Sequence, residues 1–199
     1  MSRSIDFYFF VGSTYSYLSV ARAEGVAAEA GVTLNWTPFS VRTLMREQNN
    51  SPFSGKPVKM QYMWRDIERR AARFGIPFTS PPGYPIDPEQ LANRVATLAS
   101  MEGWCRAFVQ AAYACWFLRH RDPGVPENLH AILQELGQDP ERCVRAAASP
   151  EIEALYKART DRARELGIFG SPSFVVGNEV FWGDDRLEDA VEWCVRGEG

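Results

Sequence analysis

The chain has 199 residues, of which 45% are hydrophobic and 24% charged, and its formal net charge is −3 at pH 7. This length suits one domain or two small ones with a sizeable core. The slightly acidic balance argues against a nucleic-acid partner. No apolar run reaches the roughly 18 residues that a membrane-spanning helix needs, and the first residues do not form a signal-peptide pattern. We therefore expect a cytoplasmic protein without a nucleic-acid or membrane partner.

The first elements form a predicted β-α-β unit. The apolar, aromatic-rich residues 5–11 indicate a buried strand, and residues 13–30 indicate a helix that ends at Gly31. Residues 32–39 alternate between polar and apolar side chains, which is typical of a second strand. The two strands of such a unit are parallel, and the crossover between them is right-handed.

The middle of the chain has a different character. Between about residues 40 and 155 we find no convincing strand. Five segments show helical patterns instead: 57–74, 88–101, 103–120, 126–136 and 140–147. The proline-rich stretch 77–85 cannot be helical, because its prolines remove donors and restrict their neighbours.

The last 50 residues return to a mixed pattern. After a predicted helix at 150–166, the turn Gly177-Asn178 separates two apolar runs, which indicates a β-hairpin over residues 173–182. A helix at 185–196 follows. The order β-α-β, helical block, α-β-β-α predicts an α/β domain with a helical insertion. We assign residues 1–42 and 150–199 to a discontinuous α/β domain and 43–149 to an inserted all-helical domain.

Nothing in the sequence indicates a redox dithiol or a metal site. The two histidines lack metal-ligand spacing, and the cysteines form no C-x-x-C pair. Each cysteine lies among apolar residues of a predicted helix, where a free thiol usually packs as a small hydrophobic group. The four are Cys105, Cys115, Cys143 and Cys194.

The first strand-to-helix junction, Gly12-Ser13-Thr14-Tyr15-Ser16, carries the first candidate site. The free N–H groups and partial positive charge of a helix N-terminus stabilise an anion, so Ser13 could hold a thiolate, carboxylate or phosphate. Alternatively, Ser13 only caps the helix. A hydrolase nucleophile is disfavoured, because the segment is not G-x-S-x-G and no histidine–acid pair accompanies it.

A second motif, Gly170-Ser171-Pro172-Ser173, precedes the predicted third strand. With this element order, the helical insertion and a serine where thioredoxins carry their first cysteine, the whole chain resembles the kappa-class glutathione transferases and the related 2-hydroxychromene-2-carboxylate isomerases. The resemblance implies a thioredoxin-like domain, a cis peptide before Pro172, glutathione as cofactor and, plausibly, a homodimer.

The resemblance also implies roles for individual residues. Ser13 matches the catalytic serine, and Asn50 and Lys59 match conserved positions early in the helical insertion. The backbone of Ser171 and Pro172 matches the pair that receives the cysteinyl part of glutathione.

Gly183-Asp184-Asp185-Arg186 matches a Gly-x-Asp-Arg turn that holds the γ-glutamyl end of glutathione. Asp184 and Asp185 would then be binding residues, although either could instead cap the last helix. The family usually has proline after its serine, whereas this chain has Thr14. Because of this departure, the substrate of this protein could differ from that of the family.

The segment 42–73 is basic, with eight cationic and three acidic side chains. Most are expected to be solvated, but Lys59 is singled out as a ligand for a carboxylate of glutathione or substrate. Nine aromatic residues could wall a pocket for a planar substrate, although core packing would account for most of them. They are Tyr15, Tyr17, Phe39, Phe53, Tyr62, Trp64, Tyr84, Phe169 and Trp182.

The function predicted from these features is a glutathione-dependent isomerase of small aromatic carboxylates such as 2-hydroxychromene-2-carboxylate. Donors around Ser13 would favour the thiolate, which would add transiently to a conjugated double bond and permit cis–trans rotation. The alternatives are a kappa-like glutathione transferase or peroxidase and a non-catalytic binding protein of the thioredoxin fold.

Overall fold

The structure is a computed structural model and describes residues 3–197. At its centre lies a four-stranded sheet in the order β2-β1-β3-β4. The strands are β1 (Ser4–Phe9), β2 (Thr33–Pro38), β3 (Ser173–Val176) and β4 (Glu179–Trp182). β1 is parallel to β2 and antiparallel to β3, and β3 pairs with β4 as a hairpin. The predicted β-α-β unit and hairpin are thus confirmed.

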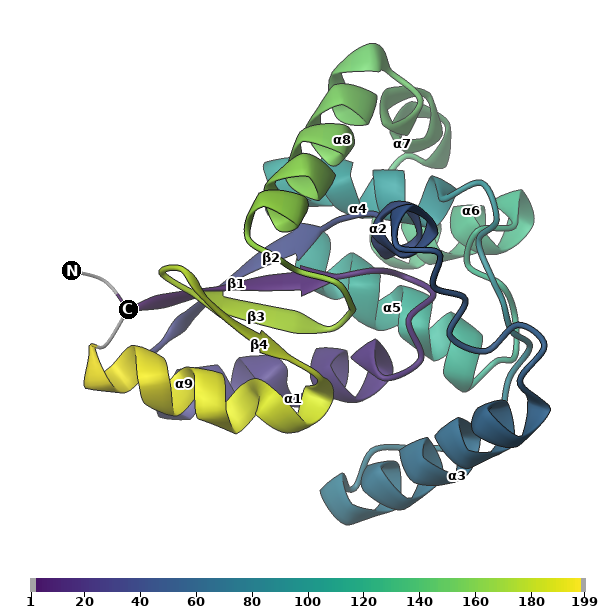
Figure 1. Cartoon of the computed structure of the whole chain (residues 1–199). Coiled ribbons are helices and arrows are strands. Elements are labelled where there is room, and N and C mark those ends of the chain that lie inside the picture. Colours follow the sequence, from purple (N-terminus) through teal and green to yellow (C-terminus); the bar gives the residue numbers. More distant parts are fainter. Residues whose placement is uncertain (1–2, 198–199) are drawn as a thin grey trace.

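The other regular elements of the described chain are helices joined by loops, and residues 40–155 contain no strand (Figure 1). Their bounds are α1 (Ser16–Glu29), α2 (Val41–Glu47), α3 (Pro57–Phe74), α4 (Leu91–Glu102), α5 (Cys105–Phe117), α6 (Pro126–Glu135), α7 (Pro140–Ala147), α8 (Pro150–Glu165) and α9 (Leu187–Arg196). In the part of the chain that is described, no helix is both long and apolar enough to cross a membrane.

The largest departures from the prediction near the site are two later helix starts and one helix that was not predicted. α1 begins at Ser16 rather than at residue 13. The last helix begins at Leu187, after a 3-10 turn over Asp184–Arg186. The short helix α2 was not predicted; its N-cap Ser40 accepts a hydrogen bond from the Thr43 amide, and this cap stabilises a helix of only seven residues.

The two faces of β1 pack against different helices. Phe7 and Phe9 join a core that includes residues of α1 and α9, and the Phe7 ring stacks on Phe174 with centroids 5.0 Å apart. Tyr8 and Phe10 point to the other face, where they pack with residues of α2 and α8. Successive strand residues alternate in direction, so burial of both faces requires the continuous apolar run seen in the sequence.

The helical segment shares its core with the sheet. α4 packs against β2, and α5 packs against α1. The same cluster of buried side chains therefore holds Phe7 of the sheet and Phe108 of α5. The predicted boundary between residues 42 and 43 falls within α2. The division into two domains stays a prediction.

A buried asparagine of α4 extends the pairing of β1 beyond its end. The Asn93 side chain accepts a hydrogen bond from the Val11 amide at 2.8 Å and donates to the Val11 carbonyl at 2.8 Å. It also donates to the Asp87 carboxylate at 2.9 Å. Because the side chain is fully buried, water cannot replace these bonds. Asn93 thus fixes the direction in which the chain leaves the sheet.

We expect Asn93→Ala to lower the free energy of unfolding by about 2–4 kcal/mol, because it leaves both polar groups of Val11 without their partner and removes one of the donors to the Asp87 carboxylate. Urea titration followed by circular dichroism measures this loss. Asn35→Ala serves as the matched control, since Asn35 makes an exposed bond to Asp6. Equal stabilities of the two variants would contradict the assigned role.

Candidate active site

Ser13 lies before α1 and does not cap it. The N-cap residue of α1 is Tyr15, and no side chain forms a cap hydrogen bond there. The Ser13 hydroxyl instead donates to the carbonyl oxygen of Ser171 at 2.6 Å. The N-cap interpretation of Ser13 is therefore wrong, because a capping oxygen accepts a hydrogen bond from a helix N–H and the Ser13 hydroxyl accepts none there.

The amide N–H groups of Thr14, Tyr15 and Ser16 form no hydrogen bond within residues 3–197. They are the free donors that a helix start leaves, and they follow directly after Ser13 in the chain. The Thr14 hydroxyl does not add a donor to this set, because it donates to the sulfur of Met63 at 3.0 Å. The residue that departs from the family pattern is thus held against α3.

The loop before β3 is tied to this junction by side-chain bonds. The Ser171–Pro172 peptide is cis, as the resemblance implied. The Ser171 hydroxyl accepts a hydrogen bond from the Phe10 amide at 3.0 Å and lies 3.0 Å from the Ser16 hydroxyl. Ser171 therefore contacts the junction through both its carbonyl and its side chain.

Tyr113 of α5 holds the junction from the opposite side. Its hydroxyl lies 2.9 Å from the Phe10 carbonyl and 3.0 Å from the Ser13 carbonyl, and its one proton is shared between these two acceptors. Burial of Tyr113 raises the pKa of its hydroxyl above the usual value, so the group remains a donor. The backbone that carries Ser13 is consequently fixed by two separate segments of the chain.

Two adjoining cavities bring the predicted site residues together. The first, which we call the serine cavity, has a volume of about 410 Å³ and is lined by Ser13, Asn50, Lys59 and Ser171. The second, the aspartate cavity, has a volume of about 360 Å³ and is lined by Ser171, Pro172, Asp184 and Asp185. Both cavities share Tyr15, Tyr62, Ser171 and Trp182, so they form one continuous cleft. All seven predicted residues therefore lie along it.

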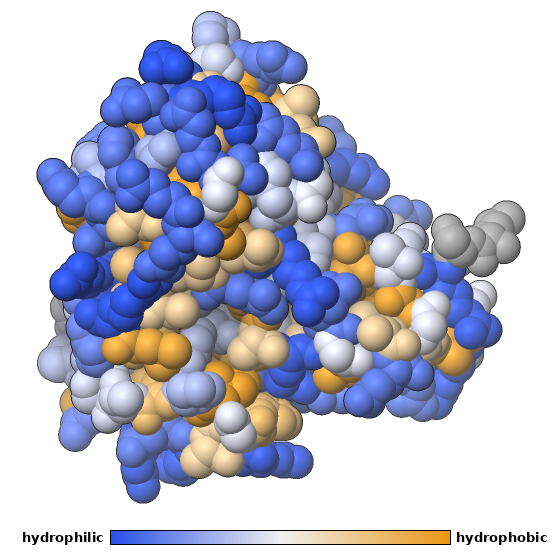
Figure 2. Space-filling view, turned by 180° about the vertical axis from the view of Figure 1, so that it is seen from behind, coloured by the Kyte–Doolittle hydropathy of each residue, from blue (hydrophilic) through white to orange (hydrophobic). Residues whose placement is uncertain are grey.

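Aromatic side chains form much of the wall of the serine cavity. Six of the nine predicted aromatic residues line it: Tyr15, Phe53, Tyr62, Tyr84, Phe169 and Trp182. Tyr17 and Phe39 belong to the buried core instead, and Trp64 lies on a different surface hollow. Figure 2 shows hydrophobic residues gathered on the side of the molecule that carries α3.

The rim of the cleft includes two exposed aromatic rings. Phe169 and Trp182 are 43% and 52% exposed, and their ring centroids lie 4.7 Å apart. A side chain at Gly170 would place its Cβ 2.1 Å from the Trp182 indole nitrogen, so only glycine fits beneath this ring. Because both rings are partly exposed at the rim, they are in a position to stack on a planar ligand in the cleft.

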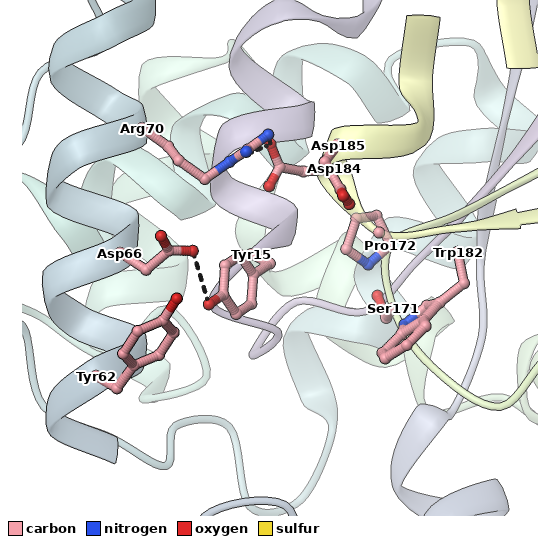
Figure 3. A pocket seen from close by; sticks show the side chains of 10 residues that line it. Tyr15, Tyr62, Asp66, Arg70, Ser171, Pro172, Trp182, Asp184 and Asp185 are labelled. Carbon is pink, nitrogen blue, oxygen red and sulfur yellow. Dashed lines mark hydrogen bonds and ion pairs between the residues drawn. The ribbon is translucent and has the colours of Figure 1, made fainter. Parts of the chain in front are cut away.

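α3 supplies one wall of the aspartate cavity. Tyr62, Asp66 and Arg70 follow one another at four-residue spacing and project from one side of the helix toward the cleft (Figure 3). The Tyr15 hydroxyl donates to Asp66 at 3.1 Å, and Arg70 pairs with Asp184 at 2.7 Å. Asp66 and Arg70 were not singled out from the sequence. Their four-residue spacing from Tyr62 nevertheless indicates that the three side chains share one face of a helix.

The two consecutive aspartates differ in their surroundings. Asp184 is 2% exposed and is paired with Arg70; its burial raises the pKa of the carboxyl, while Arg70 opposes the rise. Asp185 is exposed, and its carboxylate lies 2.8 Å from Arg186. Neither forms a cap hydrogen bond to α9. The capping interpretation is wrong, and Asp185 is the carboxylate that an incoming ligand can reach.

The four cysteines are free and buried, as predicted. Burial raises the pKa of the Cys105 thiol to about 12, and it raises the pKa values of the other three as well. No group of three histidine, cysteine or acidic side chains within residues 3–197 is arranged to hold a metal ion. A reactive thiol in this cleft must therefore come from a bound small molecule.

The fold and the site define a thioredoxin-like protein with Ser13 at the junction between its first strand and first helix and with all four cysteines buried. Residues 4–192 match the model of the DSBA-like thioredoxin domain, and the chain belongs to that family. The likeness to solved disulfide reductases of this fold is distant. One, a cytosolic disulfide reductase from Pseudomonas aeruginosa with GSH, covers 98% of this chain at 14% identity and a TM-score of 0.65.

Within the family the chain is similar to isomerases and kappa-class transferases, as its motifs predicted. It is 29% identical over 190 residues to a 2-hydroxychromene-2-carboxylate isomerase of Sphingobium xenophagum, covering 94% of this chain and 96% of the relative. It is 26% identical over 196 residues to glutathione S-transferase kappa 1 of Caenorhabditis elegans, covering 92% and 87%. A solved 2-hydroxychromene-2-carboxylate isomerase superposes with a TM-score of 0.84 at 26% identity, covering 98% and 97%.

Removal of Arg70 tests the buried pair between α3 and the 3-10 turn. Arg70→Met leaves the Asp184 carboxylate without its partner, and we expect a loss of about 3 kcal/mol of unfolding free energy at pH 7. The folded-state pKa of Asp184 is already raised above 3.8, so the destabilising charge is present at high pH and disappears as the carboxyl is protonated. The loss should therefore shrink as the pH falls toward 4.

Urea unfolding of wild type and variant at pH 7 and pH 4.5 measures this dependence. Arg69→Met is the control, because Arg69 is an exposed neighbour whose pair with Asp66 spans 3.4 Å. A loss that stays the same at both pH values would show that packing of the Arg70 side chain, and not its charge, stabilises the turn.

Proposed function

We propose that this protein is a glutathione-dependent isomerase that acts on aromatic carboxylates of the 2-hydroxychromene-2-carboxylate type. The observation that carries the proposal is the position of Ser13. It lies beside three free amide donors, in a cavity with aromatic walls and cationic side chains, in a chain whose own thiols are buried. The names of the relatives that match over nearly the whole chain support the same activity.

The residues of the cleft fit glutathione. The Ser13 hydroxyl has one proton, which it now gives to the Ser171 carbonyl. When that proton turns to a thiolate, the Ser171 carbonyl is released to accept an amide N–H of the cysteinyl unit. The Ser13 hydroxyl and the Ser171 carbonyl would each exchange their present partner for a group of the ligand. Binding of the sulfur would therefore leave neither of them without a hydrogen-bond partner.

The ends of glutathione also find complementary groups in the cleft. The exposed carboxylate of Asp185 is suited to the α-amino group of the γ-glutamyl unit. Asn50 and Lys59, which line the serine cavity with Ser13, offer an amide and an ammonium group to a carboxylate. The aspartate cavity thus offers an anionic side chain, and the serine cavity offers a cationic one.

Bound glutathione supplies a thiolate that adds to the conjugated double bond of the substrate and leaves again after rotation. The protein contributes the remaining requirements. Ser13 and the amides of Thr14 and Tyr15 stabilise negative charge at the sulfur position. The aromatic rings exclude water and hold a planar substrate. A cytoplasmic setting is part of this proposal, since glutathione and reduced cysteines coexist there.

The activity is tested by following the absorbance of 2-hydroxychromene-2-carboxylate with purified protein, with and without glutathione. We expect acceleration only when both are present. Turnover of 1-chloro-2,4-dinitrobenzene without acceleration of the chromene would instead favour the kappa-like transferase. Absence of glutathione binding at millimolar concentration, measured by calorimetry, would leave a non-catalytic binding protein.

Ser13→Ala removes the hydroxyl that faces the sulfur position. We expect turnover to fall on the order of 100-fold, because one preorganised donor to a developing anion typically contributes that much. The unfolding midpoint should change little. Ser51→Ala is the control, because Ser51 is exposed and lies outside the serine cavity. Equal turnover of the Ser13 variant and wild type would remove Ser13 from the mechanism.

A further inference from the structure

The charges that line the serine cavity are all of one sign. Its two ionised side chains are Arg42 and Lys59, and no acidic residue is among those that line it. Neither cation forms an ion pair with a carboxylate of the described residues. An aromatic cavity with two uncompensated cations is suited to aromatic anions.

Arg42 is the more deeply placed of these two cations. Lys59 is exposed at the rim, whereas Arg42 is half-buried at the start of α2. The guanidinium of Arg42 lies over the Phe10 ring, with its carbon 4.8 Å from the ring centroid. A charge in this partly desolvated position interacts more strongly with an anion than an exposed ammonium does.

Backbone carbonyls hold the guanidinium in place without neutralising it. One terminal nitrogen donates to the Asp87 carbonyl at 2.6 Å, and the other donates to the Ile86 carbonyl. These bonds use two of the five N–H groups of the arginine. The other three N–H groups form no hydrogen bond within residues 3–197, and the positive charge is retained, so the guanidinium can still bind a carboxylate.

The guanidinium also lies close to the residue that precedes Ser13. A Cβ built on Gly12 would be 3.5 Å from a terminal nitrogen of Arg42, and Gly12 immediately precedes Ser13. Gly12 has a φ of +125°, a conformation that residues with a side chain rarely adopt. The space beside the guanidinium is therefore not filled by a side chain at this position. The cation thus lies close to the backbone that leads into Ser13, and both residues line the serine cavity.

We propose that Arg42 binds the carboxylate of the aromatic substrate, while Lys59 serves glutathione. Anchoring of the carboxylate at Arg42 orients the substrate so that its conjugated carbons lie toward Ser13. The identity of the substrate rests on the proposed function, but the binding of an aromatic carboxylate at Arg42 does not require turnover.

Calorimetric titration with trans-cinnamate, in the absence of glutathione, tests the proposal. We expect Arg42→Met to weaken cinnamate binding about 10- to 100-fold, because it removes a charge-assisted pair, and Arg42→Lys to restore part of the affinity. Binding of the neutral analogue cinnamyl alcohol should change less than twofold. Arg46→Met is the matched control, because Arg46 is exposed on the same helix and lies outside the serine cavity.

The outcomes separate this proposal from the proposed function. If wild type does not bind cinnamate at millimolar concentration, or if Arg42→Met binds it equally well, the role of Arg42 is overturned. A weaker affinity of Arg42→Met for glutathione, with unchanged cinnamate binding, would assign the residue to the cofactor instead. Arg42-dependent cinnamate binding in a protein that does not isomerise the chromene would retain the anion site and reject only the isomerase activity. Circular dichroism confirms that each variant is folded.

Discussion

The site depends on the hydrogen bonds that hold the chain where it leaves β1. Ser171 accepts a bond from the Phe10 amide and receives another from Ser13, Tyr113 bonds two carbonyls of the same segment, and Asn93 pairs with Val11. Backbone polar groups that leave a sheet into a packed interior need such partners. Because these partners come from α4, α5 and the loop before β3, the position of Ser13 is fixed by the whole fold rather than by its own helix.

Hydrophobic periodicity and the placement of proline and glycine were sufficient to predict the sheet and most helices. The start of α1 was not predictable in this way, because a serine before a helix has the same local appearance whether it caps the helix or bonds a distant carbonyl. α2 escaped detection for another reason: its seven residues are too few to show a helical period. Its cap at Ser40 was the one local signal.

Those site residues that belong to short sequence motifs could be predicted from the sequence. Ser13, Ser171 and Asp185 were placed by residue patterns, and the structure brings them to one cleft. The roles of the cations were not predictable, because the eight basic residues of segment 42–73 look alike in sequence. Tertiary packing distinguishes them, since Arg70 meets a buried carboxylate and Arg42 lies against an aromatic ring.

The burial of all four cysteines has a consequence for how the surroundings act on this protein. A protein with an accessible dithiol exchanges electrons directly with other disulfides, and its state follows the redox poise of its compartment. Here every sulfhydryl is enclosed and held in its protonated form, so thiol–disulfide exchange has no accessible partner in the native fold. Oxidising conditions therefore cannot act on the cleft through disulfide formation by these four cysteines while the protein is folded.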